Sequence, residues 1–136
     1  MATIAVGSKP WDVAVNPDTK RLYTANEAGN DVSVIDAASG SVLATIAVGR
    51  GPSSLAVNPE TNRIYVANAW DDTVSVIDGA SNTVVATVPV GQGPWAVAVN
   101  PNTNRIYVPN SWSDSVSVID GATDSVVATV PVGQHP

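Results

Sequence analysis

Short runs of apolar and β-branched residues, separated by turn-forming residues, follow one another along this chain. Its middle third holds four such runs: LAVN, RIYVAN, TVSVID and TVVATVPV. No segment keeps a 3.6-residue period over ten residues, so the pattern predicts strands and not helices. Asn58-Pro59-Glu60-Thr61 lies between the first two runs and Asp78-Gly79-Ala80-Ser81-Asn82 between the last two. Both sequences are typical of tight hairpin turns.

The same pattern recurs with a period of 42 residues, which is the separation of Asn16 from Asn58 and of Asn58 from Asn100. Four short strands in a period of about 40 residues are the signature of a β-propeller blade. We therefore predict one all-β domain made of three four-stranded antiparallel blades, cut from a longer or engineered repeat array. Its parts are an extra outer-strand copy at 1–9 and repeats at 10–51, 52–93 and 94–136.

The second run of the middle repeat carries the motif Tyr65-Val66-Ala67-Asn68. Its counterparts are Tyr23-Thr24-Ala25-Asn26 and Tyr107-Val108-Pro109-Asn110. With Asn-Pro-x-Thr-Asn-Arg before the motif and Val-x-Val-Ile-Asp-Gly after it, the chain resembles the YVTN-repeat β-propeller family over nearly its whole length. The resemblance implies a propeller, often of about seven blades, in secreted, periplasmic or cell-surface proteins of bacteria and archaea. It implies no single activity and no catalytic residue.

Composition excludes several classes of partner. The 136 residues include no Cys, and the formal net charge is −6 with six Lys plus Arg. Such a chain lacks the basic surface that nucleic acid or an anionic membrane requires. No apolar run approaches the ~20 residues of a membrane-spanning helix. Residues 1–7 are apolar, but without a basic start or a long apolar stretch they are not predicted to be a signal peptide.

Three blades leave one apolar face open at each end of the arc, because closed propellers have ~4–8 blades that cover each other. An open apolar face marks an association site. We therefore predict self-association, preferably as a head-to-tail homodimer of about six blades, with a trimer as the alternative. Pro89 and Pro131 fall inside the fourth strands and predict that these strands are sheet edges. The first strand of each repeat is then innermost.

With that strand order, the two hairpins of each blade share one rim and the remaining connections share the other. All four Trp residues fall on the second rim. The candidate binding rim consists of Trp11, Trp70, Asp71, Asp72, Trp95, Trp112 and Asp114. Exposed Trp rings and carboxylates favour a glycan or a protein ligand. In the alternative interpretation, Trp11 and Trp95 cover the channel mouth or wedge between blades, while Trp70 and Trp112 pack over loop backbones.

Recurring charges have a structural interpretation. Three Arg residues open second strands and three Asp residues close third strands, so each pair is predicted to meet across its sheet. The pairs are Arg21 with Asp36, Arg63 with Asp78, and Arg105 with Asp120. Asp71 and Asp72 alone do not approach the ~6–8 oxygens that Ca²⁺ needs, so no metal site is predicted.

The inventory of side chains disfavours catalysis. The single His is His135, and without Cys the chain lacks the common nucleophile and base pairs; no cofactor site is predicted either. We expect a non-enzymatic self-assembling scaffold or a binding module. Two alternatives stay open. One is a fragment of a cofactor-dependent or lactone-hydrolysing propeller enzyme, which would place carboxylates or His in the central channel. The other is an engineered or evolutionary fragment with no ligand.

Overall fold

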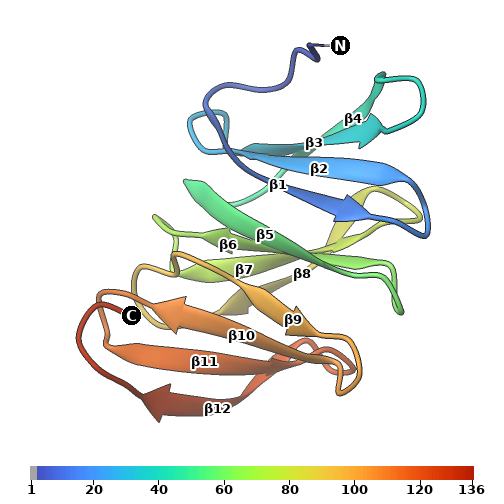
Figure 1. Cartoon of the computed structure of the whole chain (residues 1–136). Coiled ribbons are helices and arrows are strands. Elements are labelled where there is room, and N and C mark those ends of the chain that lie inside the picture. Colours follow the sequence, from blue (N-terminus) through green and yellow to red (C-terminus); the bar gives the residue numbers. More distant parts are fainter. Residues whose placement is uncertain (1–2) are drawn as a thin grey trace.

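The computed structural model describes residues 3–136, which form three antiparallel sheets of four strands and no helix (Figure 1). Blade 1 consists of β1 (Pro10–Asn16), β2 (Arg21–Asn26), β3 (Asp31–Asp36) and β4 (Val42–Ala47). Blade 2 consists of β5 (Pro52–Asn58), β6 (Arg63–Asn68), β7 (Thr73–Asp78) and β8 (Thr83–Pro89). Blade 3 consists of β9 (Ala98–Asn100), β10 (Arg105–Asn110), β11 (Ser115–Asp120) and β12 (Ser125–Pro131). The predicted all-β class and the three four-stranded blades are confirmed.

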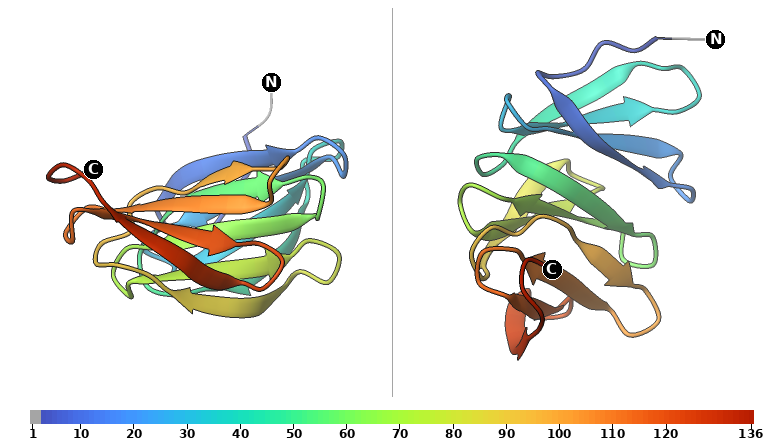
Figure 2. Two further views of the ribbon diagram at one scale, coloured as in Figure 1. Left: turned by 90° about the horizontal axis from the view of Figure 1, so that it is seen from below. Right: turned by 60° about the vertical axis from the view of Figure 1, so that its left-hand side comes forward.

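Each sheet runs in chain order from an inner strand to an outer strand. The inner strands touch each other, β1 against β5 and β5 against β9, whereas the outer strands are in much less contact. The blades are therefore stacked as a fan (Figure 2). Pro89 and Pro131 are the last residues of β8 and β12, which confirms their predicted place on sheet edges. At an edge, the missing proline N–H removes no hydrogen bond from the interior of a sheet.

Side chains shape both tight turns of a blade. In the first turn, Asn58 Oδ1 accepts a hydrogen bond from the Glu60 N–H at 3.1 Å. In the second, Asp78 Oδ1 accepts from the Ala80 N–H, also at 3.1 Å. Because such a contact holds the backbone in a turn without help from elsewhere, the hairpins follow from local sequence.

The predicted Arg and Asp pairs do lie opposite each other in all three blades. Only one of them, Arg105 with Asp120, comes within ion-pair distance in residues 3–136, at 3.8 Å. The Asp side chains bind the following turn instead: Asp36 accepts from the Ser39 hydroxyl at 2.8 Å. That hydrogen bond is the main cause of the lowered pKa of Asp36. Turn formation thus accounts for these carboxylates better than ion pairing does.

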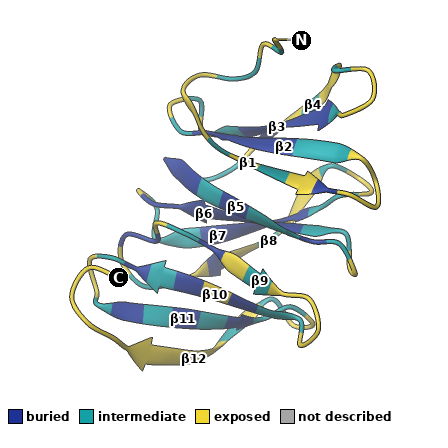
Figure 3. Cartoon of the chain, in the orientation of Figure 1, coloured by how far each residue is buried: buried dark blue, intermediate teal, exposed yellow. Residues whose placement is uncertain are grey.

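The apolar core lies between the blades (Figure 3). In the first interface, Tyr23, Val32 and Val34 of blade 1 meet Leu55, Ile64 and Val66 of blade 2. In the second, their counterparts 42 positions later meet in the same way, as Tyr65, Val74 and Val76 pack against Val97, Ile106 and Val108. We name the two surfaces of a blade the Tyr face (Tyr23, Val32, Val34 and counterparts) and the Ile face (Leu55, Ile64, Val66 and counterparts). One interface design is used twice.

Neighbouring blades also share a buried polar link at the hairpin rim. The Asn16 side-chain N–H donates to Asn62 Oδ1, and the Asn58 side-chain N–H donates to Asn104 Oδ1, each at 3.1 Å. Both donor residues are fully buried. The residue of blade 1 that corresponds to Asn62 is Lys20, which has no side-chain acceptor.

A second buried amide differs between the blades and leads to a testable prediction. Asn26 Oδ1 accepts from the Thr24 hydroxyl at 3.1 Å, whereas Asn68 Oδ1 has no hydrogen-bond partner among the described residues. Val66 stands where blade 1 has Thr24. Val66→Thr is expected to leave the chain about 1 kcal/mol more stable than Val74→Thr. Only the hydroxyl introduced at position 66 can donate a hydrogen bond to the unpaired Asn68 Oδ1. Urea unfolding measures both, and equal losses would contradict the prediction.

Candidate functional site

The loop rim is the surface formed by residues 27–30, 48–51, 69–72, 90–93 and 111–114. It contains the loops between second and third strands together with the linkers between blades. The Val48 N–H donates to the Asn30 carbonyl at 3.0 Å, and the Trp70 N–H donates to the Arg50 carbonyl at 3.2 Å. The linker is thus held between the loops of the two blades that it joins. This confirms the prediction that linkers and these loops share one rim.

Three polar side chains of the loop rim bind the backbone of a linker or of the C-terminal segment. Asn30 Oδ1 accepts from the Gly51 N–H at 3.0 Å, and Asp72 Oδ1 accepts from the Gly93 N–H at 2.9 Å. Asp114 Oδ1 accepts from the His135 N–H at 2.9 Å. Two of the candidate carboxylates, Asp72 and Asp114, therefore have one oxygen each engaged in fixing the chain's path.

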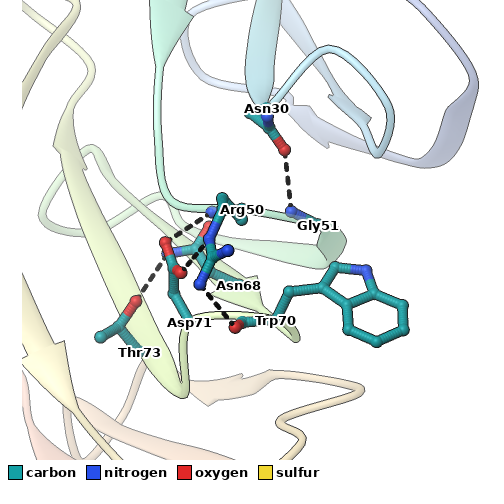
Figure 4. A network of polar contacts seen from close by, with 7 residues as sticks. All are labelled: Asn30, Arg50, Gly51, Asn68, Trp70, Asp71 and Thr73. Carbon is teal, nitrogen blue, oxygen red and sulfur yellow. Dashed lines mark hydrogen bonds and ion pairs between the residues drawn. The ribbon is translucent and has the colours of Figure 1, made fainter.

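Asp71 is also engaged within the rim (Figure 4). Its carboxylate accepts from the Arg50 backbone N–H at 2.8 Å and from Arg50 Nε at 2.6 Å. The backbone hydrogen bond, followed by the side-chain one, lowers the pKa of Asp71. The Arg50 side chain is 71% exposed, so water screens the ion pair. Asp71 thus anchors the linker between blades 1 and 2.

All four Trp side chains are about half exposed: Trp11 55%, Trp70 54%, Trp95 48% and Trp112 53%. Trp70 and Trp112 meet edge to face across blades 2 and 3, with ring centroids 5.8 Å apart and planes at 61°. Aromatic pairs prefer this geometry. In the described residues, no aromatic contact joins Trp11 or Trp95 to this pair. The structure therefore brings together two of the four predicted rings.

The paired rings also lie on the linkers. A Cβ added to Gly51 would overlap Trp70 Cδ1, and one added to Gly93 would stand 2.7 Å from Trp112 Cδ2. Trp70 and Trp112 thus contact the backbone of the linkers that cross the loop rim. About half of each side chain remains in contact with solvent.

Trp11 has partners that the sequence analysis missed. The Lys9 ammonium lies 5.6 Å from the Trp11 ring centroid and forms an ion pair with Glu27 at 2.7 Å. Hydrogen bonding to Lys9 is the main cause of the lowered pKa of Glu27, and Trp70 contributes a smaller part. Glu27 opens a loop in which the other blades have Ala69 and Ser111. That variation between repeats, the signal that picked out the Trp residues, also marks Glu27.

The enzyme alternative requires carboxylates or His on the inner strands, which would line the centre of a closed propeller. Asp12 on β1 is the one carboxylate of the three inner strands. It accepts from Ser54 Oγ and from the Leu55 N–H, both at 3.1 Å, and so links blade 1 to blade 2. Within residues 3–136 no three His, Asp or Glu side chains gather where an ion could bind.

Among the same residues there is no helix long and apolar enough to span a membrane.

Two shallow clefts of about 440 and 410 Å³ open beside the outer strands, at equivalent positions in the repeat. One is lined by Ser115, Ser117 and Thr129, and the other by the counterparts of these residues. A third hollow of about 280 Å³ is lined by Trp11, Val13 and Thr24. It lies on the Ile face of blade 1, where blades 2 and 3 are covered by a preceding blade. The first two clefts therefore recur with the repeat, whereas the third exists because no blade covers the Ile face of blade 1.

Gly51→Ala is expected to lift Trp70 off the linker. The φ of Gly51 is +65°, a conformation that costs an L-residue ~1–2 kcal/mol, and the new methyl group would also overlap the indole. We expect a loss of about 1–2 kcal/mol in urea unfolding, together with a changed near-UV circular dichroism signal from the Trp70 and Trp112 pair. Gly133→Ala is the control, because no atom of residues 3–136 lies within 4 Å of its Cβ position. An unchanged aromatic signal in Gly51→Ala would contradict the prediction.

Stacked four-stranded antiparallel blades with their inner strands in contact define this chain as a partial β-propeller of three blades. A family model described as YNCE-like beta-propeller matches residues 52–136. The chain belongs to that family. A search of curated proteins gave no match.

Solved structures support the same fold. The chain is similar to hydrazine synthase of Kuenenia stuttgartiensis, with a TM-score of 0.90 and 27% identity over 100% of this chain and 40% of that one. It is also similar to apo AztD from Citrobacter koseri (TM-score 0.80, 16% identity, 100% and 38% covered) and to U3-55K (0.86, 16%, 96% and 42%). At 16% identity the likeness shows the fold alone. This chain spans about 40% of the length of these structures.

Proposed function

We propose that this chain is a non-enzymatic, self-assembling propeller segment that joins a second copy of itself head to tail through its open blade faces. The observation that carries the proposal is that each open face repeats a face that already pairs inside the chain. The Tyr face of blade 3 presents Tyr107, Val116 and Val118, the counterparts of the buried Tyr65, Val74 and Val76.

The Ile face of blade 1 completes the match. It contains the exposed Val13, the partly buried Leu22 and the buried Thr24, the counterparts of Leu55, Ile64 and Val66. Val13 is 59% exposed and Tyr107 is 38% exposed, whereas Leu55 and Tyr65 are 4% and 0% exposed. Joining the two open faces therefore removes from water the kind of surface that the two internal interfaces already bury.

Two copies joined at both ends give a closed ring of about six blades, which is within the usual range for propellers. Three copies would give about nine, which is above it. The dimer is therefore the preferred state, and the trimer is the alternative.

The concentration dependence of the mass in solution tests this proposal. Light scattering or sedimentation is expected to show twice the 13.9 kDa of one chain. Val118→Glu should shift the equilibrium toward the monomer, because it puts a charge in the new interface. Val127→Glu is the matched control: its counterpart Val85 stays 47% exposed with blade 3 in place. A single species of one-chain mass at all concentrations would overturn the proposal.

The two junctions between copies differ from the junctions inside the chain in one polar contact. At each junction between copies, the exposed Asn100 of one copy would meet Lys20 of the other, where the internal junctions pair Asn with Asn. Lys20→Asn is expected to tighten the dimer by about 5- to 100-fold, the equivalent of two net hydrogen bonds, one at each junction. Sedimentation equilibrium of this variant beside the unchanged chain measures the shift. Lys20→Ala, which adds no acceptor, is the control.

A second role is favoured by the Trp70 and Trp112 pair, which lies half open to solvent on the loop rim. We propose that this pair binds a saccharide, whose ring can lie against an indole face while its hydroxyl groups bond to nearby loop oxygens. Titration with an oligosaccharide panel, followed by Trp fluorescence, tests it. Trp112→Ala should abolish the response and Trp95→Ala should keep it. Binding of peptides instead would replace the saccharide with a protein ligand.

The finer family assignment is also a proposal. The motifs at Tyr23, Tyr65 and Tyr107 support a YVTN-repeat assignment, and with it the secreted, periplasmic or cell-surface location that the resemblance implies. The carboxylates of the loop rim and Asp12 bind neighbouring backbone or side chains, which supports a role without catalysis.

A further inference from the structure

Residues 3–7 lie against the open end of blade 1 without forming a strand. Residues 1 and 2 of the predicted extra outer-strand copy are outside the described part of the chain. We infer that residues 3–7 occupy the surface of blade 1 that the outer strand of a second copy would need, so that they restrain assembly until they are displaced. The inference rests on the self-assembly proposed above.

The apolar contact of this segment follows the repeat. Ile4 is the counterpart of Ile46 and Val88, which end outer strands and are 6% and 3% exposed against the next blade. The Ile4 side chain lies on blade 1, with Cδ1 3.6 Å from the Cβ position of Gly40. Ile35 is only 2% exposed, although no blade of this chain precedes blade 1. That edge of the Ile face is thus already covered.

A glycine contact repeats in the same way. Gly49 and Gly91 lie so close to the next blade that a Cβ on either would be 2.7 Å from Cγ of Asn68 or Asn110. Gly7 lies equally close to blade 1, where a Cβ would be 2.5 Å from Asn26 Nδ2 and 2.7 Å from Asp31 Oδ1. The Gly7 N–H also donates to Ser33 Oγ at 3.3 Å. We name the surface formed by Asn26, Asp31, Ser33 and Gly40 the outer-strand site.

The fourth counterpart, Gly133, has no atom of residues 3–136 within 4 Å of its Cβ position. Val130, the counterpart of Ile4, is 46% exposed. The chain therefore has four strand ends that fit an outer-strand site but only three such sites. In a head-to-tail dimer, Gly7 of one copy and Gly133 of the other compete for the same Asn26.

The two competitors are held unequally. β12 is paired with β11 from Ser125 to Pro131, whereas residues 3–6 have no strand pairing. Moving the N-terminal segment gives up few hydrogen bonds, but moving β12 breaks a strand ladder. The outer strand of the second copy is therefore the one that takes the site. Until then, the bound segment lowers the fraction of chains able to assemble, and the apparent dissociation constant rises by the inverse of that fraction.

Two single substitutions test the exchange. Gly7→Val places side-chain atoms where Asn26 and Asp31 stand, so it releases the segment and is expected to tighten the dimer by about tenfold. Gly133→Val places side-chain atoms where Asn26 of the other copy would lie, so it is expected to weaken the dimer by about tenfold. Sedimentation velocity over a concentration series measures both. Neither glycine belongs to an interface between blades of the same chain, and thermal unfolding of the dilute proteins checks that the fold is kept.

The outcomes separate the two proposals. If the unchanged chain dimerises but Gly7→Val weakens the dimer or leaves it unaltered, the displacement inference is wrong and self-assembly stands. If the unchanged chain dimerises only at high concentration and Gly7→Val dimerises at about tenfold lower concentration, both are supported, because the bound segment lowers the fraction of chains able to assemble. If neither protein dimerises at any concentration, both are wrong.

Discussion

Ile64→Ala is expected to destabilise the chain by about 3 kcal/mol and to loosen blade 1 from blade 2. Ile64 is fully buried and stands in the middle of the first interface. Removing it leaves a cavity between two sheets that are held apart by their other side chains, and such truncations cost ~2–5 kcal/mol. Urea unfolding of dilute protein measures the loss.

The chain supplies a matched control at the same place in the repeat. Leu22 is the counterpart of Ile64, but it lies on the open Ile face of blade 1 and is only partly buried. In a monomer, Leu22→Ala should cost about 1 kcal/mol or less, since a partly exposed side chain leaves no closed cavity. At dimer-forming concentrations, the same variant should lose part of its association. Equal losses for the two variants in dilute solution would show that the core does not lie between blades.

The sequence carried most of the fold because the repeat fixes what each residue meets. Inside the chain, the Tyr face of one blade contacts the Ile face of the next blade, so the 42-residue repeat also indicates which residues meet. Turns were predictable for a different reason. Asn58 and Asp78 hold their hairpins through bonds to residues two positions on, and such bonds need no information from distant parts of the chain.

The loop rim was only partly predictable, because its contacts depend on how linkers cross it. The sequence placed Asp72 on the candidate binding rim, but the hydrogen bond from the Gly93 N–H to its carboxylate forms only when the next linker packs against the loop. The Arg and Asp pairs lie opposite each other as predicted, but of the three only Arg105 and Asp120 come within ion-pair distance in residues 3–136. In blade 1, Ser39 and the turn N–H groups bind the carboxylate of Asp36 instead. The register thus placed the Arg and Asp side chains correctly, but it did not show which neighbouring groups bind the carboxylates.

The role of residues 3–7 also lay beyond the sequence. The repeat identified them as a copy of an outer strand but did not show what they contact. In the structure, Ile4 and Gly7 contact the blade of their own chain. An unpaired strand copy can do so because Asn26 and Ser33 present the same surface that Asn68 and Ser75 present to the preceding linker. Because equivalent surfaces recur in every blade, a single strand copy can bind to more than one of them.

Raising the pH from about 10 to about 12 is expected to destabilise the chain by about 2–3 kcal/mol through Tyr65. Burial raises the pKa of this phenol to about 12, and the nearby Asp124 carboxylate adds to the shift. Below the unfolded pKa near 10, the phenol is protonated in both states and its contribution to stability is complete. Between the two pKa values only the unfolded chain ionises, so stability is lost as the pH rises through that window.

Tyr65→Phe isolates this effect. The Tyr65 hydroxyl has no hydrogen-bond partner among residues 3–136, so at pH 7 the variant should be as stable as the unchanged chain or slightly more stable. As the pH rises from about 10 to about 12, the free energy of unfolding of the variant should fall by about 2–3 kcal/mol less than that of the unchanged chain. The pKa of Tyr23 is also raised by burial, so part of the alkaline loss should remain. Tyr107→Phe, on the open face of blade 3, is the control, and an alkaline loss unaltered in Tyr65→Phe would mean that water reaches the second blade interface.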